Sequence, residues 1–87
     1  MNAGQLADRL AIVDVVNRYA TALDARDWDL LDQVFSSDVI GDFGDHRLRD
    51  RDAVKDMIRG MLGGCGPSQH LLANHRVELD GDLATCI

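Results

Sequence analysis

The stretch LADRLAIVDVVNRYATALDARDW, residues 6–28, decides the fold of this 87-residue chain. Its apolar residues recur at three- and four-residue steps, which is the period of one buried helix face. The residues of this face are Leu6, Leu10, Val13, Val16, Ala20 and Leu23. Ile12, Val15 and Tyr19 widen the face. We therefore expect a helix over residues 5–23 whose surface is buried by the rest of the protein around more than half of its circumference.

The residues after this helix predict a second helix and two short strands. Asp27 is a suitable N-cap for a shorter helix over residues 28–35. Residues 39–43 read as a short strand, because Gly41 and the glycine that follows the strand limit its length. A brief second strand is expected over residues 47–49.

Asp50 then predicts the start of a third helix over residues 51–64. Its apolar side chains again recur at helical spacing, and the glycine pair Gly63-Gly64 stops it. After Pro67 the apolar pattern changes to period two, which predicts a long strand over residues 68–80.

The tripeptide Asp80-Gly81-Asp82 predicts a tight hairpin, and residues 83–87 begin the returning strand. The sequence stops inside this strand, which leaves a sheet edge open. Two interpretations follow: the chain is a fragment, or a second copy covers the edge. The fragment is the favoured interpretation, with residues 1–87 forming one domain, or its N-terminal two-thirds.

Composition excludes several classes of function. The net charge of −6 makes nucleic acid and anionic membrane surfaces unfavourable partners. No apolar run approaches the roughly 20 residues that span a bilayer, and the N-terminus lacks a secretory signal pattern. Cys65 and Cys86 lie far apart in unlike contexts. We expect reduced thiols and a cytoplasmic protein.

Tyr19 is the first candidate for chemistry, because its phenol lies within the apolar helix face. Such a ring is either a core tyrosine with a backbone partner or a proton donor directed into a cavity. Asp24 follows five residues later and lies about 140° round an ideal helix from Tyr19. It is either a turn aspartate or a base beside an apolar cavity, and the pattern leaves both open.

His70 stands near the start of the expected long strand, in register with Leu72 and Asn74. It is either a hydrogen-bonded core histidine or an acid–base group. His75 falls on the opposite face, and His46 lies in a polar loop where we expect it to be solvated. No metal site is expected, because nothing places three ligands within reach.

The combined pattern resembles the SnoaL-like domain of the nuclear-transport-factor-2-like superfamily. The resemblance rests on residues 6–44, on RDAVKDMIRGML and on PSQHLLANHRVELDGDLAT, with RYATALDARDWD and QHLLANHRVELDGD as its most specific parts. It implies an α+β, cone-shaped fold in which three N-terminal helices pack on a curved, mostly antiparallel sheet around an apolar pocket. Members include polyketide cyclases, dehydratases, ketosteroid isomerases and epoxide hydrolases, as well as proteins with no enzymatic role.

In the dehydratase-like branch of this family, a helix tyrosine, an aspartate five residues later and a strand histidine line the pocket. The resemblance carries these roles to Tyr19, Asp24 and His70, and it predicts that the first helix ends or distorts just before Asp24. Family domains usually exceed a hundred residues, so the sheet of this chain is expected to be incomplete.

The expected ligand-binding wall comprises Val16, Trp28, Phe43, Met61 and Asn74. The function that the resemblance implies is a cofactor-independent lyase or isomerase, such as a dehydratase, cyclase or ketosteroid-isomerase-like enzyme, acting on a small apolar ring compound by proton transfer. The alternative is a non-catalytic ligand-binding or dimerisation module of the same fold. A homodimer or a higher homo-oligomer is expected in either case.

Overall fold

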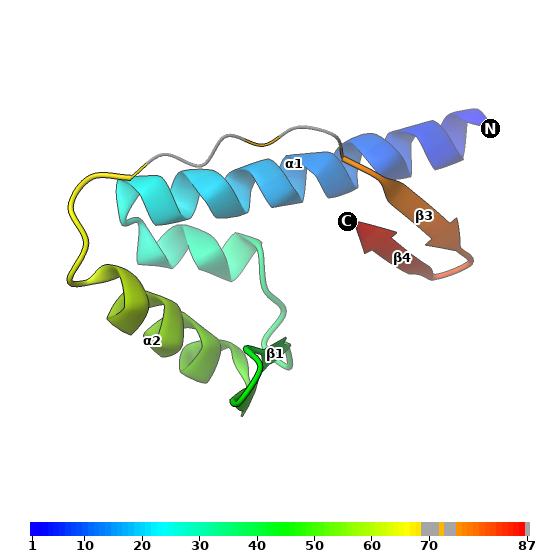
Figure 1. Ribbon diagram of the computed structural model, residues 1–87. Helices are drawn as coiled ribbons and strands as arrows, with labels where there is room; N and C mark the ends of the chain where they lie inside the picture. The colour runs from blue at the N-terminus through cyan, green and yellow to red at the C-terminus, as the bar shows by residue number, and fades with distance from the viewer. Residues whose placement is uncertain (69–71, 73–74, 87) are drawn as a thin grey trace.

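The computed structural model describes residues 1–68, 72 and 75–86 of the chain. Helices and antiparallel hairpins form an α+β structure, as predicted (Figure 1). In chain order the elements are α1 (Ala3–Ala25), the 3-10 helix η1 (Trp28–Gln33), β1 (Ile40–Asp42), β2 (Arg47–Arg49), α2 (Arg51–Leu62), β3 (Val77–Asp80) and β4 (Leu83–Cys86).

Helix α1 is longer than predicted at both ends. Asn2 and Gln5 form a capping box at its start: the Gln5 amide donates to Asn2 Oδ1 at 2.8 Å, and the Asn2 amide donates to Gln5 Oε1 at 3.1 Å. The helix then continues to Ala25, so Asp24 lies inside its last turn. The prediction that the helix ends or distorts before Asp24 is therefore wrong.

The residue that ends α1 is Arg26, which adopts the left-handed conformation with φ 55°. Its amide donates to the Leu23 carbonyl at 3.1 Å, and the next amide, of Asp27, donates to the Ala22 carbonyl at 2.8 Å. This pair of bonds is a Schellman motif, a common way of closing a helix C-terminus, with arginine where glycine is usual. Apolar periodicity carries no signal for this motif, which is why the helix end was misplaced.

The predicted N-caps of the later helices are confirmed. The Leu30 amide donates to Asp27 Oδ1 at 3.3 Å at the start of η1. The Ala53 amide donates to Asp50 Oδ1 at 2.9 Å at the start of α2, which ends at Leu62 before the glycine pair. The second helix is a 3-10 helix and is two residues shorter than predicted.

The core lies where the C-terminal half of α1 meets η1, α2 and the first hairpin (Figure 1). Its buried side chains are Ala22, Leu23, Leu31, Val54 and Ile58, which we call the core cluster. Leu31 of η1 and Val54 of α2 are the largest fully buried side chains. The short 3-10 helix thus supplies the centre of the core, because it lies between the two longer helices.

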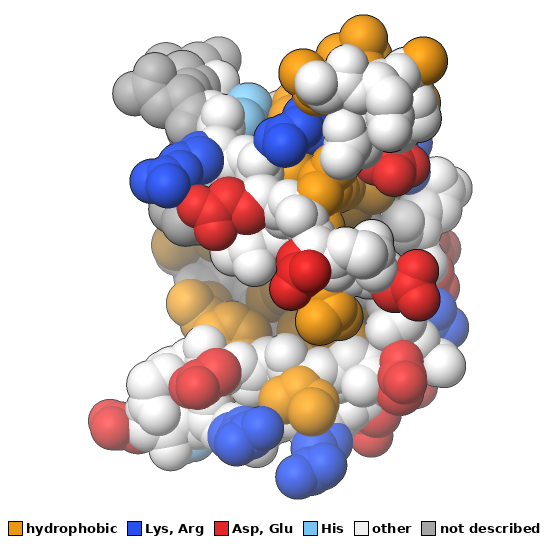
Figure 2. All heavy atoms as spheres, turned by 90° about the vertical axis from the view of Figure 1, so that its right-hand side faces the viewer, with side chains coloured by type: hydrophobic (Ala, Val, Ile, Leu, Met, Phe, Trp, Pro, Cys, Tyr) orange, Lys and Arg blue, Asp and Glu red, His pale blue; other side chains and the backbone are white. Residues whose placement is uncertain are grey.

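The N-terminal half of α1 does not carry the buried face that its sequence predicts. Leu6 and Leu10 are 49% and 60% exposed, and Figure 2 shows apolar side chains open on the face at this end of the molecule. Strand β3 of the second hairpin contacts α1, and the Arg9 guanidinium in this half donates to the Val77 carbonyl. The burial prediction fails here because the described chain supplies too few partners.

The strands form two separate antiparallel hairpins, so the sheet is incomplete as expected. In the first, Ile40 pairs with Arg49; in the second, Val77 pairs with Cys86 across the predicted turn at Gly81, whose φ is 59°. The predicted strand over residues 68–80 is correct only from Val77. Residues 68, 72, 75 and 76 are not in a strand, and residues 69–71 and 73–74 lie outside the described residues.

An ion-pair cluster joins η1 to α2 beside the core. Lys55 Nζ lies 2.8 Å from Asp32 Oδ1, and Arg51 Nε lies 3.3 Å from the same oxygen. The hydrogen bond from Lys55, with the positive charges of Lys55 and Arg51, holds the pKa of Asp32 below its ordinary value. The Lys55 side chain is buried, so Asp32 supplies the counter-charge that this position requires.

Replacing Leu31 with alanine should strongly reduce stability. The side chain is fully buried, so Leu31→Ala should lower the free energy of unfolding by about 2–5 kcal/mol through lost burial and the cavity left behind. Urea unfolding followed by circular dichroism measures this change. Leu10→Ala is the matched control, because it removes the same atoms from an exposed helix position and should cost less than about 0.5 kcal/mol. Equal losses in the two variants would contradict this core assignment.

Candidate functional site

Asp24, in the last turn of α1, is held by the loop that follows α2. The Ser68 hydroxyl donates to Asp24 Oδ1 at 2.9 Å, and Arg26 Nη1 donates to the Ser68 hydroxyl oxygen at 2.9 Å. Asp24 and Ser68 are both half-buried. A carboxylate is therefore fixed in place at the end of a helix by a hydroxyl that an arginine supports.

The Arg26 guanidinium binds two further backbone oxygens. Nη2 donates to the Gly66 carbonyl at 2.8 Å, and Nη1 donates to the Leu23 carbonyl at 2.5 Å. A positive charge beside the last carbonyls of a helix also interacts favourably with the helix dipole. Arg26 thus ties the loop over residues 63–68 to the end of α1.

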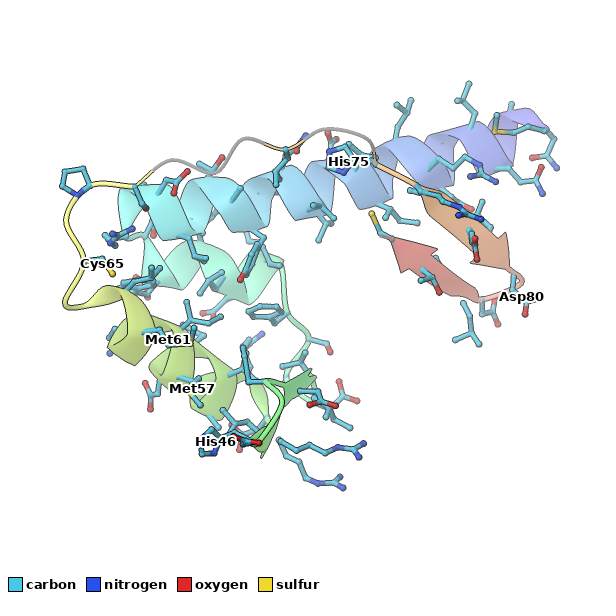
Figure 3. The ribbon with its side chains drawn as sticks, in the orientation of Figure 1. His46, Met57, Met61, Cys65, His75 and Asp80 are labelled. Carbon is cyan, nitrogen blue, oxygen red and sulfur yellow. The ribbon has the colours of Figure 1, made fainter. Side chains whose placement is uncertain are left out.

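A hollow of about 330 Å³ opens beside this carboxylate. It is lined by Asp24, Arg26, Cys65, Gly66 and Pro67. The thiol comes from just beyond the C-terminal end of α2 (Figure 3) and is exposed. The hollow therefore offers a carboxylate, a guanidinium and a thiol on one concave surface.

Sequence reasoning selected Asp24 but missed Arg26 and Ser68. Arg26 was not singled out because arginine rarely occupies the left-handed position that ends a helix. Ser68 lies 44 residues from Asp24 in the sequence, and a local sequence pattern cannot predict a contact between residues so far apart. The only available signal was the position of Ser68 two residues before His70.

Tyr19 lies on the core side of α1. Its ring is half-buried, packs against the core cluster and makes an edge-to-face contact with Phe35, with centroids 6.0 Å apart and an interplanar angle of 63°. Burial raises the pKa of Tyr19 above its ordinary value of 10.0. The phenol therefore stays protonated at neutral pH, where its hydroxyl can donate a hydrogen bond or a proton and its oxygen can also accept a hydrogen bond.

The unbroken helix separates Tyr19 from Asp24. Each residue of an α-helix advances by about 100°, so side chains five positions apart point about 140° away from each other. Tyr19 accordingly faces the core cluster, and Asp24 faces the loop that carries Ser68. The two residues are not brought onto one face of α1.

The remaining predicted site residues are dispersed. His70 and Asn74 lie outside the described residues. Val16 is half-buried on α1, and both Trp28 and Phe43 pack against the core cluster. Met61, at the C-terminal end of α2, is 61% exposed (Figure 3).

A second hollow, of about 340 Å³, lies between the N-terminal half of α1 and the second hairpin. Asp8, Ile12, Leu79 and Leu83 are among the residues that line it. Of the predicted site residues that the structure describes, none is in its lining, so it supports the site assignment less well than the hollow beside Asp24.

Within residues 1–68, 72 and 75–86, no group of three or more His, Cys, Asp or Glu side chains is arranged to hold a metal ion. In the same part of the chain, no helix combines the length and the apolar character needed to cross a membrane.

Comparison with known families identifies the fold. The model of the SnoaL-like domain matches residues 4–87, which is nearly the whole chain. The chain belongs to the SnoaL-like domain family. The resemblance drawn from the sequence is thereby confirmed, and with it the α+β fold class. This family includes polyketide cyclases and isomerases.

Among curated proteins, this SnoaL-like chain is similar to two mycobacterial proteins. It is 32% identical over 89 residues to the uncharacterized protein Mb2934c of Mycobacterium bovis and to the uncharacterized protein Rv2910c of Mycobacterium tuberculosis. Each match covers 98% of this chain and 59% of the relative, so the chain spans about three fifths of the relatives' length. No solved structure gives a significant match.

The raised pKa of Tyr19 predicts a pH dependence of stability. Burial favours the neutral phenol, so its contribution to stability should be complete below the unfolded-state value near 10 and should be lost as pH rises through the folded-state pKa. Tyr19 is the only tyrosine in the chain, so near-ultraviolet tyrosinate absorbance reports on it directly. Titration in buffer and in concentrated urea should give a higher midpoint for the folded chain. Identical midpoints would contradict the burial of this ring.

Proposed function

We propose that this SnoaL-like protein is a cofactor-independent lyase or isomerase that moves a proton on a small apolar ring compound. The reaction class is proton abstraction next to a carbonyl, followed by loss of water or a bond shift. The observation that supports it best is the Asp24 carboxylate, which Ser68 and Arg26 hold beside a hollow of about 330 Å³. A carboxylate fixed at the edge of a cavity is suited to general base catalysis.

The proposed roles follow from the protonation states. Asp24, in its ionised form, and His70 form the acid–base pair: one takes the proton from carbon, and the pair returns it to the new position. Tyr19 remains protonated and polarises the carbonyl or hydroxyl oxygen of the substrate. The support for Asp24 is geometric, whereas the support for Tyr19 is its protonated state and its match to the family pattern.

The two curated relatives are longer than this chain. Because this chain spans 59% of their length, the remaining wall of the proposed pocket is expected from segments beyond the matched region in those proteins. Tyr19 and Asp24 diverge on α1, so a substrate touching both has to bridge two sides of the helix end.

The second candidate is a non-catalytic ligand-binding or dimerisation module. Two observations favour it: the Tyr19 ring is packed against Phe35, and Leu6 and Leu10 are exposed on one half of α1. In this case the apolar half of α1 contacts a second copy of the chain, and Asp24 serves only to anchor the loop. A homodimer is compatible with both candidates.

Deuterium exchange into a simple ring ketone tests the enzymatic proposal without the natural substrate. The purified chain in heavy water should accelerate exchange of the α-protons of β-tetralone, because abstraction of these protons is the proposed first step. Proton nuclear magnetic resonance follows the loss of the α-proton signals. Asp24→Asn and Tyr19→Phe should each reduce the enzymatic rate by ~10²–10⁴-fold.

Asp14→Asn is the matched control, since it removes an exposed carboxylate from the same helix and should leave the exchange rate unchanged. If wild-type chain and Asp24→Asn exchange the ketone at the same rate, the enzymatic proposal is wrong. The non-catalytic module then becomes the better account.

A further inference from the structure

We propose that Ser68 and Arg26 are positioning residues that orient the Asp24 carboxylate and favour its ionised form, which is the form that acts as a base. The inference rests on the proposed function, in which Asp24 belongs to the acid–base pair. It adds two residues that neither the sequence pattern nor the family match assigns. It also specifies that the ionised form of Asp24 is the form that the proposed reaction uses.

The direction of each hydrogen bond follows from the chemistry of the three groups. A guanidinium has donors only, so the Arg26 contact requires the Ser68 oxygen to accept. The single hydroxyl proton of Ser68 is donated to Asp24 Oδ1, and a carboxylate accepts such a bond more strongly than a neutral carboxyl does. The chain Arg26 to Ser68 to Asp24 therefore has one orientation, and it favours negative charge on Asp24.

The Arg26 guanidinium is itself held rigidly. Its backbone is fixed by the Schellman motif, and its side chain donates to the carbonyls of Leu23 and Gly66 as well as to Ser68. The group that orients the Ser68 hydroxyl is thus fixed before any ligand arrives. Groups placed in this way avoid reorganisation during reaction, which is the basis of electrostatic preorganisation.

The Ser68 contact also concerns the second member of the proposed pair. Ser68 precedes His70 by two residues in the sequence, and its bond to Asp24 joins the last described residue before this histidine to the end of α1. Within the part of the chain that the structure describes, the other titratable or charged groups that line the hollow beside Asp24 are Arg26 and Cys65. Of these, Arg26 carries the fixed positive charge.

Nuclear magnetic resonance titration of the Asp24 carboxyl carbon tests this inference directly. Ser68→Ala removes the hydroxyl donor and should move the Asp24 titration midpoint upward by about one pH unit. Ser68→Thr keeps a hydroxyl and should bring the midpoint back toward that of the wild type. Ser36→Ala, in an exposed turn, is the matched control and should leave it unchanged.

Arg26→Gly provides a second and independent variant. Glycine is the residue best suited to the left-handed position, so the helix end should remain intact while the guanidinium is lost. This variant should also raise the Asp24 midpoint. In the β-tetralone assay, both Ser68→Ala and Arg26→Gly should slow exchange by about tenfold, and Ser68→Thr should recover most of the rate.

The outcomes separate this inference from the function on which it rests. An unchanged Asp24 midpoint in both Ser68→Ala and Arg26→Gly overturns the positioning role, even if the wild-type chain exchanges the ketone. Shifted midpoints together with no exchange by the wild type support the hydrogen-bond chain and overturn the enzymatic proposal. Shifted midpoints with slowed exchange support both.

Discussion

The reversal of the chain at Arg26 and Asp27 is the constraint on which the rest of the structure depends. One left-handed residue ends α1, and the next residue closes the Schellman motif and caps η1. This sharp turn places η1 directly against the helix it has just left, so that Leu31 enters the core cluster. Without the turn, the apolar face of α1 and that of η1 would not meet.

An arginine at this position carries a conformational cost that glycine would avoid. A left-handed conformation costs an L-residue about 1–2 kcal/mol, because its Cβ approaches the following carbonyl oxygen. The guanidinium offsets this cost through its hydrogen bonds to Leu23, Gly66 and Ser68. The same residue thus ends a helix, anchors a distant loop and supports the hydroxyl that holds Asp24, which links the fold to the proposed site.

The parts of the fold that local patterns encode were predictable. The caps at Asp27 and Asp50, the start of α2 and the turn at Gly81 were predictable from side-chain chemistry or from the spacing of apolar residues, whereas α2 ends at Leu62, two residues earlier than predicted. The end of α1 did not, because its Schellman motif uses backbone bonds and an arginine in place of glycine. The prediction of burial along the N-terminal half of α1 was also wrong, since Leu6 and Leu10 are largely exposed. The spacing of apolar residues does not show whether another segment covers them.

The site was predictable only in part, for a related reason. The family pattern selected Asp24 and Tyr19, but it implied that they meet in one pocket, whereas an unbroken helix directs them apart. The contact of Asp24 with Ser68 joins residues that are distant in sequence, and apolar period does not encode such contacts. Membership of the SnoaL-like family therefore locates the candidate residues, and the geometry at the end of α1 determines what Asp24 can do.

The central claim is that α1 runs intact through Asp24 and that the loop after α2 comes to it there. Assigned nuclear magnetic resonance spectra of the chain test this most directly. The account predicts helical backbone shifts through Ala25, a left-handed value at Arg26, and a nuclear Overhauser contact between the Asp24 and Ser68 side chains. Helical shifts that stop before Asp24, or the absence of that contact, would contradict it.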